Sequence, residues 1–195
     1  MTIVRLALVA SAAALTGACR GRPAVAPDPR AIPAPAPLQT LRADQVFILE
    51  HTGTEPGDTV AAIVPGAART VVLRHASPDN TVFATVAVPA AGFSGAGDTV
   101  HLTLRPRPGV YGLDVAADAT FGPGIVLTFK YAVHFAAPAA AIERYRHAPA
   151  LERRLSVARR NADGSFTLLA SGRPASDNLA VFLSAPGSYY VVAPR

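Results

Sequence analysis

The stretch that decides the fold runs Ile125-Val126-Leu127-Thr128-Phe129-Lys130-Tyr131-Ala132-Val133-His134-Phe135. Every second residue from Ile125 onward is apolar or aromatic, and the residues between them include a threonine, a lysine and a histidine. Successive side chains of a β-strand point to opposite faces, so this alternation predicts one long strand over 125–135 with one face in a core.

The same alternation recurs elsewhere in the chain. Between Asp98 and Arg105, three apolar residues at 100, 102 and 104 share one face, and His101 takes the other. Further strands are expected at Gln45–Glu50, Arg69–His75, Asn178–Ser184 and Gly187–Ala193. In the last of these, Tyr189 and Tyr190 point to opposite faces, which predicts one core tyrosine and one exposed tyrosine.

Turn sequences separate these segments at short, regular intervals. Asn161-Ala162-Asp163-Gly164 joins two apolar runs as the loop of a hairpin. Helix is expected only around Ala139 to His147, where Pro149 is expected to stop it. The pattern predicts an all-β fold, a single antiparallel β-sandwich over 41–195. Residues 41–69 either add strands to the sandwich or extend the segment before it.

The N-terminus has the features of an export signal. Arg5 precedes a ten-residue apolar run, and Leu15-Thr16-Gly17-Ala18-Cys19 follows. This segment resembles the bacterial lipobox, although the leucine lies one position early. The resemblance implies a signal peptide over 1–18 and acylation of Cys19, the only cysteine in the chain. The alternative is an ordinary signal peptide cut near Ala18.

Prolines dominate the segment after Cys19, six of them between Arg20 and Thr40. Such a sequence favours extended polyproline II over helix or sheet and predicts a disordered Pro/Ala-rich tether over 19–40. Two or more acyl chains on Cys19 would make membrane attachment stable. Arg20 stands where an aspartate would mark retention at the inner membrane in the typical Gram-negative sorting rule, so the outer membrane is favoured.

A family resemblance follows from three later segments. Val86-Ala87-Val88-Pro89-Ala90-Ala91-Gly92-Phe93, Phe121–Tyr131 and Val181–Val192 together resemble the ZU-five-type domain over about residues 70–195. The resemblance implies a binding or spacing module without a cofactor. Some members of that family cleave themselves at His-Phe-Ser. Here Phe182-Leu183-Ser184 lacks the histidine and His134-Phe135-Ala136 lacks the serine, so self-cleavage is not expected.

Candidate catalytic and metal-binding residues form weak patterns. Gly92-Phe93-Ser94-Gly95-Ala96 misses the last glycine of the hydrolase elbow and precedes a strand where the elbow needs a helix. The five histidines, at 51, 75, 101, 134 and 147, have none of the close spacings of zinc sites. His101 and His134 could meet only if their strands pair. Asp114 and Asp118 supply too few oxygens for calcium. No cofactor and no metal site are therefore expected.

The strongest charge feature lies between Ala141 and Arg160, where six arginines face two glutamates. The arginines are Arg144, Arg146, Arg153, Arg154, Arg159 and Arg160. They suit an anionic surface, or else form a solvated face that pairs with nearby acids. Nucleic acid is not expected, because no aromatic residues interleave with the arginines and the chain reads as exported.

Taken together, the sequence favours a lipid-anchored envelope protein that presents a non-catalytic β-sandwich to an envelope protein or an anionic glycolipid. The alternative is an exported hydrolase or metal-binding enzyme that uses Ser94, or His101 with His134. The oligomeric state is left open.

Overall fold

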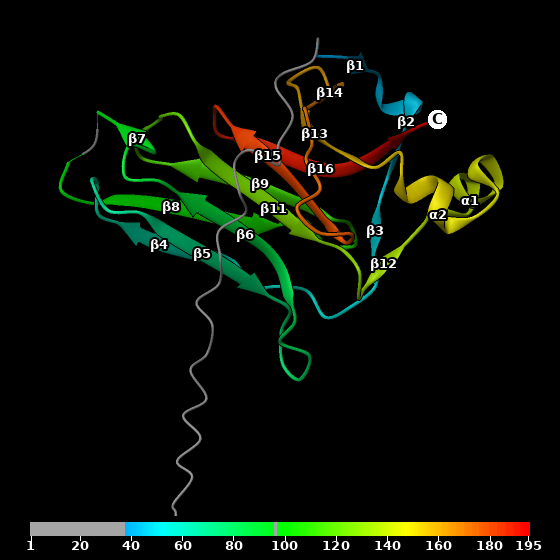
Figure 1. Ribbon diagram of the computed structural model, residues 1–195, viewed down its shortest axis with the longest axis horizontal. Coiled ribbons are helices and arrows are strands. Elements are labelled where there is room, and N and C mark those ends of the chain that lie inside the picture. The colour runs from blue at the N-terminus through cyan, green and yellow to red at the C-terminus, as the bar shows by residue number, and fades with distance from the viewer. Residues whose placement is uncertain (1–37, 96) are drawn as a thin grey trace, which may run out of the picture.

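The computed structural model describes residues 38–95 and 97–195, and two antiparallel sheets packed face to face account for most of them (Figure 1). The expectation of an all-β sandwich is confirmed. The predicted signal peptide over 1–18, the lipidation predicted at Cys19 and residues 20–37 of the predicted tether lie outside the described residues.

The larger sheet has eight strands. They are β1 (Thr40–Leu41), β2 (Val46–Ile48), β4 (Thr59–Ile63), β8 (Val100–Pro106), β9 (Gly112–Ala117), β13 (Ser156–Arg160), β14 (Phe166–Leu168) and β16 (Gly187–Pro194). Their order is β1-β14-β13-β16-β9-β8-β4, and β2 pairs with the far end of β16. A 3-10 turn, η2 (Ala43–Gln45), joins β1 to β2.

The smaller sheet and two short ribbons complete the β-structure. The sheet runs β15-β11-β6-β5, with β5 (Arg69–Arg74), β6 (Val82–Val88), β11 (Ile125–Lys130) and β15 (Asn178–Leu183). One ribbon pairs β7 (Phe93–Ser94) with β10 (Thr120–Phe121), and the other pairs β3 (Glu50–His51) with β12 (Phe135–Ala136). The two sheets share one core, in which Leu102 and Leu104 of β8 lie with Leu127 and Phe129 of β11.

The predicted strand over 125–135 is too long. β11 ends at Lys130, residues 132–134 form a turn, and the chain resumes as β12. The alternation continues past Lys130 because Tyr131 and Phe135 pack edge to face across this turn, 5.9 Å between ring centroids. Periodicity records which side chains are buried, and it contains no signal for a turn whose flanking residues are both apolar.

The predicted helix is two helices. α1 (Ala139–Tyr145) ends before α2 (Ala148–Glu152) begins, and Pro149 lies in the first turn of α2. The expectation that Pro149 stops the helix is wrong. Proline is tolerated in the first turn of a helix, because the backbone N–H that it lacks would have no hydrogen-bond partner within the helix there. Tyr145 donates from Oη to the Pro194 carbonyl, and Arg173 Nη2 donates to the carbonyls of Glu152 and Leu155. These contacts hold both helices against the end of the sandwich.

Residues 41–69 belong to the sandwich, since they supply Leu41 of β1 and all of β2, β3 and β4. Thr40, which the sequence assigned to the tether, pairs with Thr167 in the sheet instead. Tyr189 and Tyr190 are both buried, contrary to prediction, because the ring of Tyr190 packs edge to face on Phe166 of β14, 5.6 Å between centroids. Tyr189 lies in the main core, whereas Tyr190 packs in a second cluster that includes Val46 of β2.

The two helices are short. Neither of the helices in the described part of the chain has the length and apolar character needed to cross a bilayer.

Candidate functional site

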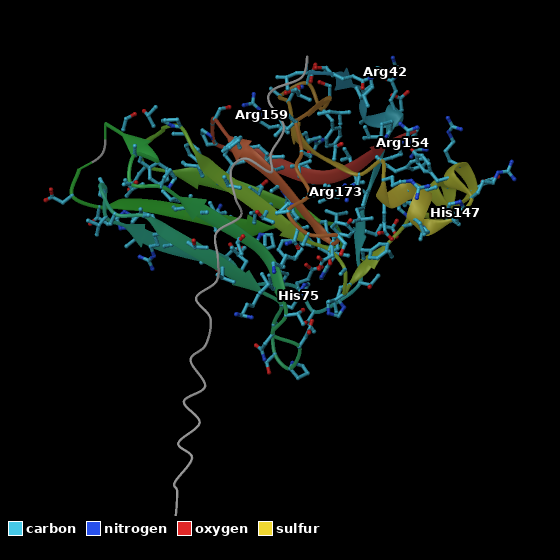
Figure 2. The ribbon with its side chains drawn as sticks, in the orientation of Figure 1. Arg42, His75, His147, Arg154, Arg159 and Arg173 are labelled. Carbon is cyan, nitrogen blue, oxygen red and sulfur yellow. The ribbon has the colours of Figure 1, made fainter. Side chains whose placement is uncertain are left out.

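Three histidines from distant parts of the chain meet at one end of the sandwich. His51 ends β3, His75 follows β5, and His134 lies in the turn between β11 and β12. Figure 2 labels His75 at the lower end of the molecule, where the smaller sheet ends. Asp79 reaches the same place from the loop between β5 and β6. We call His51, His75, Asp79 and His134 the histidine cluster.

The strand pairing explains how these side chains come together. The β3–β12 ribbon pairs His51 with Phe135, so His134 is adjacent to the partner of His51. The Thr52 N–H and hydroxyl both donate to the His134 carbonyl and hold the turn in place. The backbone N–H of His75 donates to the Thr81 carbonyl, which closes the loop that carries Asp79.

His51 and His75 form the buried half of the cluster. Their rings stack with centroids 4.9 Å apart, and His51 Nε2 lies 3.1 Å from His75 Nδ1. His75 Nδ1 also lies 3.0 Å from the carbonyl oxygen of Thr54. On the other side of His51, Nδ1 is 3.5 Å from a carboxylate oxygen of Glu55 but makes no hydrogen bond within the described residues. Glu55 accepts a hydrogen bond from the Gly109 N–H at 2.7 Å.

His134 and Asp79 form the accessible half. His134 Nε2 hydrogen-bonds to Asp79 Oδ2, which also accepts from the Thr81 hydroxyl at 3.1 Å. Their side chains are 24% and 20% exposed, so solvent reaches this side of the cluster. The His134 ring lies 4.7 Å from the His75 ring, centroid to centroid. A ligand atom from each of His75, Asp79 and His134 falls within 4.8 Å of the other two.

Aromatic residues make the floor of the cluster. Phe83 meets the rings of His51 and His75 edge to face, at 5.7 Å and 5.6 Å, and Tyr111 meets His51 at 5.3 Å. Gly53 lies against the His134 ring, where a Cβ would come within 2.5 Å of a ring carbon. The side chains of the histidine cluster thus lie between the aromatic rings on one side and the backbone of Gly53 on the other.

Burial and hydrogen bonding set the electrostatics of the cluster. Burial lowers the pKa of His51, and the neighbouring His75 and His134 add to that effect against the opposing carboxylate of Glu55. Desolvation tends to raise the pKa of Asp79, but hydrogen bonds from His134 and Thr81 outweigh it and lower that pKa. The cluster therefore favours neutral His51 beside an ionised Asp79.

The residues predicted for enzymatic chemistry lie apart from one another. Ser94 is exposed in β7, opposite Thr120 of β10, and no hydrogen bond joins its side chain to a histidine or an acid in the described ranges. His101 lies on β8, which pairs with β4 and β9 and not with β11. The suggested meeting of His101 with His134 does not occur.

Asp114 and Asp118, weighed for calcium, each face a base. Asp114 accepts from Arg107, with the closest approach 2.8 Å, and Asp118 accepts from the backbone N–H and ring Nδ1 of His101. Those hydrogen bonds lower the pKa of Asp118. The two carboxylates therefore have separate partners.

The six predicted arginines do not form one patch. Arg144, Arg146, Arg153 and Arg154 lie on α1, α2 and the residues that follow them, and all four are exposed. Figure 2 shows Arg154 near the helices and Arg159 well away from it. Arg159 lies beside Tyr189, whereas Arg160 lines a shallow groove with Phe166. The two arginines of β13 diverge because neighbours in a strand point to opposite faces.

The sequence left open whether the six predicted arginines pair with nearby acids. Across residues 38–95 and 97–195, the arginines that pair with acids are Arg42, Arg105 and Arg107. None of the six predicted arginines has an acidic partner there. The alternative of a solvated face whose arginines pair with nearby acids is therefore not what the described residues show.

Sequence reasoning missed the histidine cluster because its three histidines are 24 and 59 residues apart along the chain. One signal was present: each of the three histidines lies at or near the end of an alternating segment. Such ends meet at the rim of an antiparallel sandwich. Comparisons of the chain with protein-family models, with curated proteins and with solved structures find no match.

Proposed function

We propose that this chain is a lipid-anchored protein of the bacterial cell envelope, and that its non-catalytic β-sandwich binds a phosphate-bearing lipid surface. Cys19 carries the lipid, the proline-rich segment is the tether, and the outer membrane is the favoured location. The sandwich acts as the interaction module that the ZU-five-type resemblance implies. The observation that supports this proposal best is a set of exposed arginines on and beside α1 and α2 that have no acidic partner among the described residues.

These four arginines, which we call the arginine arm, are Arg144, Arg146, Arg153 and Arg154. Two glutamates, Glu143 and Glu152, share the same segment, which leaves a net charge of +2. A guanidinium presents a planar fork of donors that matches the oxygens of a phosphate. Arginines without an acidic partner thus have donors free for an anionic surface.

Rigid attachment favours binding, because less conformational freedom is lost when the partner docks. Tyr145 Oη lies 2.5 Å from the Pro194 carbonyl oxygen, and Arg173 Nη1 donates to Tyr131 Oη at 2.9 Å. Leu151 of α2 is buried at 1% exposure. The arm is thus a fixed projection of the sandwich, which suits it to meet a flat charged surface.

Vesicle binding tests the role of the arm. The full chain with Cys19→Ala, which removes the lipid, is mixed with vesicles of neutral phosphatidylcholine or of phosphatidylcholine with phosphatidylglycerol. Binding to the anionic vesicles alone is expected, and it should weaken as salt rises from low to physiological strength. Changing all four arm arginines to glutamine should abolish it.

A matched control separates the arm from net charge. Arg42, Arg69, Arg74 and Arg105 are also four exposed arginines, and they lie elsewhere on the sandwich. Changing these four to glutamine removes the same charge and should leave most of the binding. Equal loss in both variants would reduce the effect to overall charge and would contradict the role of the arm.

Cell fractionation tests the anchor separately. In the native host, the wild-type chain should sediment with membranes, and Cys19→Ala should release it into the soluble fraction. If Cys19→Ala stays with the membrane as firmly as the wild type, the lipid-anchor proposal is wrong.

A further inference from the structure

We propose that His75, Asp79 and His134 form a binding site for a divalent transition-metal ion of the Zn²⁺ class, with His51 and Glu55 as the groups that orient it. The site lies outside the arginine arm, and the proposal does not depend on the function proposed above. It rests on the tautomers that the contacts impose, on the ligand set, and on the burial of the imidazoles.

The contacts of His75 fix which of its nitrogens is free for a metal. A carbonyl oxygen can only accept, so the Thr54 carbonyl 3.0 Å away assigns the ring proton to Nδ1. The other nitrogen, Nε2, then carries the lone pair. Metal-binding histidines commonly donate their second ring N–H to a backbone carbonyl or a carboxylate, which orients the ring and raises its basicity. His75 has this arrangement in place.

His51 contacts His75 on the side that faces away from the proposed metal site. Its Nε2 lies 3.1 Å from His75 Nδ1, whose one proton is then shared between the Thr54 carbonyl and His51 Nε2. The remaining proton of a neutral His51 is then on Nδ1, which faces the Glu55 carboxylate at 3.5 Å. The Glu55 carboxylate lies on the side of His51 away from His75 and favours a proton on His51 Nδ1, although no hydrogen bond joins them among the described residues.

The ligand set selects the class of ion. Two imidazoles and one carboxylate suit Zn²⁺ and its neighbours, whereas Ca²⁺ and Mg²⁺ prefer shells of oxygen. Tetrahedral Zn²⁺ with bonds of about 2.0–2.1 Å needs ligand atoms about 3.3 Å apart. The ligand atoms of His75, Asp79 and His134 lie within 4.8 Å of one another, so binding of the ion requires them to move closer together. The ion takes the place of the proton between His134 Nε2 and Asp79.

Three protein ligands leave one position of a tetrahedral ion open. The open position faces solvent, because His134 and Asp79 are partly exposed whereas His75 is buried at 2%. This exposure gives the ion a path of entry and leaves room for a water molecule or a small anion as the fourth ligand.

Burial argues against a purely structural role for the cluster. Two buried polar rings need hydrogen bonds to offset their desolvation, and apolar side chains would fill the same space without that requirement. Here one nitrogen of His51 has no hydrogen bond to any described residue. The three imidazole rings also lie with their centroids no more than 6.0 Å apart, which gathers several metal-ligating nitrogens in one place. A cation bound by His75 and His134 would give two of these three imidazoles a use that a purely structural role does not.

Titration of the full chain with Zn²⁺ in mild detergent tests the proposal. The wild type should bind one ion with a Kd of about 1 μM or tighter. His134→Ala and Asp79→Ala should each weaken binding by about 100-fold or more, since even partners beyond the ligands are worth about 10–100-fold. Substituting Co²⁺ should give the intense visible absorption of tetrahedral coordination, and both variants should lose it.

Controls distinguish this site from other sources of zinc binding. Circular dichroism and the unfolding midpoint show whether each variant is folded, and the partial exposure of His134 and Asp79 favours folded variants. His101→Ala removes the exposed histidine that also contacts an aspartate, and it should bind Zn²⁺ as the wild type does. The arm variant with four glutamines should also bind normally. The proposal is overturned if the wild type binds no ion, or if folded His134→Ala and Asp79→Ala bind as tightly as the wild type.

Discussion

Two histidine–aspartate pairs in this protein have the same chemistry and different surroundings. His101 and Asp118 lie 2.9 Å apart on the outer side of β8, with side chains 60% and 52% exposed. His134 and Asp79 make the same contact, but they are less exposed and lie beside two buried histidines and an aromatic floor. Water competes for every hydrogen bond of the first pair. The second pair has neighbours that fix its geometry, and a pair becomes a candidate site only through such neighbours.

The largest expected effect comes from removing the floor beneath the second pair. Phe83 is 1% exposed and contacts both buried histidines and Tyr111. Phe83→Ala should lower the free energy of unfolding by about 3–5 kcal/mol, measured by urea denaturation, and should weaken Zn²⁺ binding in the fraction that folds. Phe182 is 42% exposed, and Phe182→Ala should cost about 1 kcal/mol or less. Similar losses of unfolding free energy in the two variants would mean that Phe83 does not support the histidine cluster more than an exposed phenylalanine does.

Zinc itself should stabilise only the chain with the intact second pair. An ion that binds the native state alone adds about 2.7 kcal/mol at a free concentration of 100 times Kd. The thermal midpoint of the wild type and of His101→Ala should therefore rise by several degrees with Zn²⁺. His134→Ala should show no such rise. An equal rise in all three proteins would place the ion somewhere other than the histidine cluster.

A smaller effect is expected from crowding the ring of His134. Gly53 leaves no room for a Cβ, which would lie 2.5 Å from that ring. Gly53→Ala should cost about 1–3 kcal/mol, because overpacking forces the ring or the backbone to move, and it should weaken Zn²⁺ binding as well. A Cβ on Gly57 would have no described atom within 4 Å, so Gly57→Ala should change the urea midpoint little. A neutral Gly53→Ala would show that the ring of His134 is free to move.

The two regions also differ in how far the sequence could predict them. Alternation identified most strands, including the hairpin of β13 and β14, because a half-buried strand records its burial at every second residue. It failed at the turn over 132–134, where apolar residues flank the change of direction, and at Tyr190, which packs on Phe166 of β14. It could not reveal the histidine cluster, because strand pairing rather than sequence spacing brings its members together. The turn sequence Ser77-Pro78-Asp79-Asn80 likewise contains no sign that Asp79 faces His134.

The smallest expected effect concerns the exposed pair of His101 and Asp118, which has no buried neighbours to fix its geometry. Hydrogen bonds from the ring and backbone of His101 lower the pKa of Asp118. His101→Ala removes the ring and leaves the backbone N–H, so the pKa of Asp118 should rise only part of the way to its ordinary value, as measured by NMR titration. A folded-state pKa below the unfolded value means that the contribution of Asp118 to stability is present above the unfolded pKa and is lost as the pH falls through the folded pKa. His101→Ala should therefore be slightly less stable than the wild type near neutral pH and equally stable in strong acid. A pKa that does not move on His101→Ala would show that water already screens this pair fully, and would make the buried neighbours of His134 the sole difference between the two pairs.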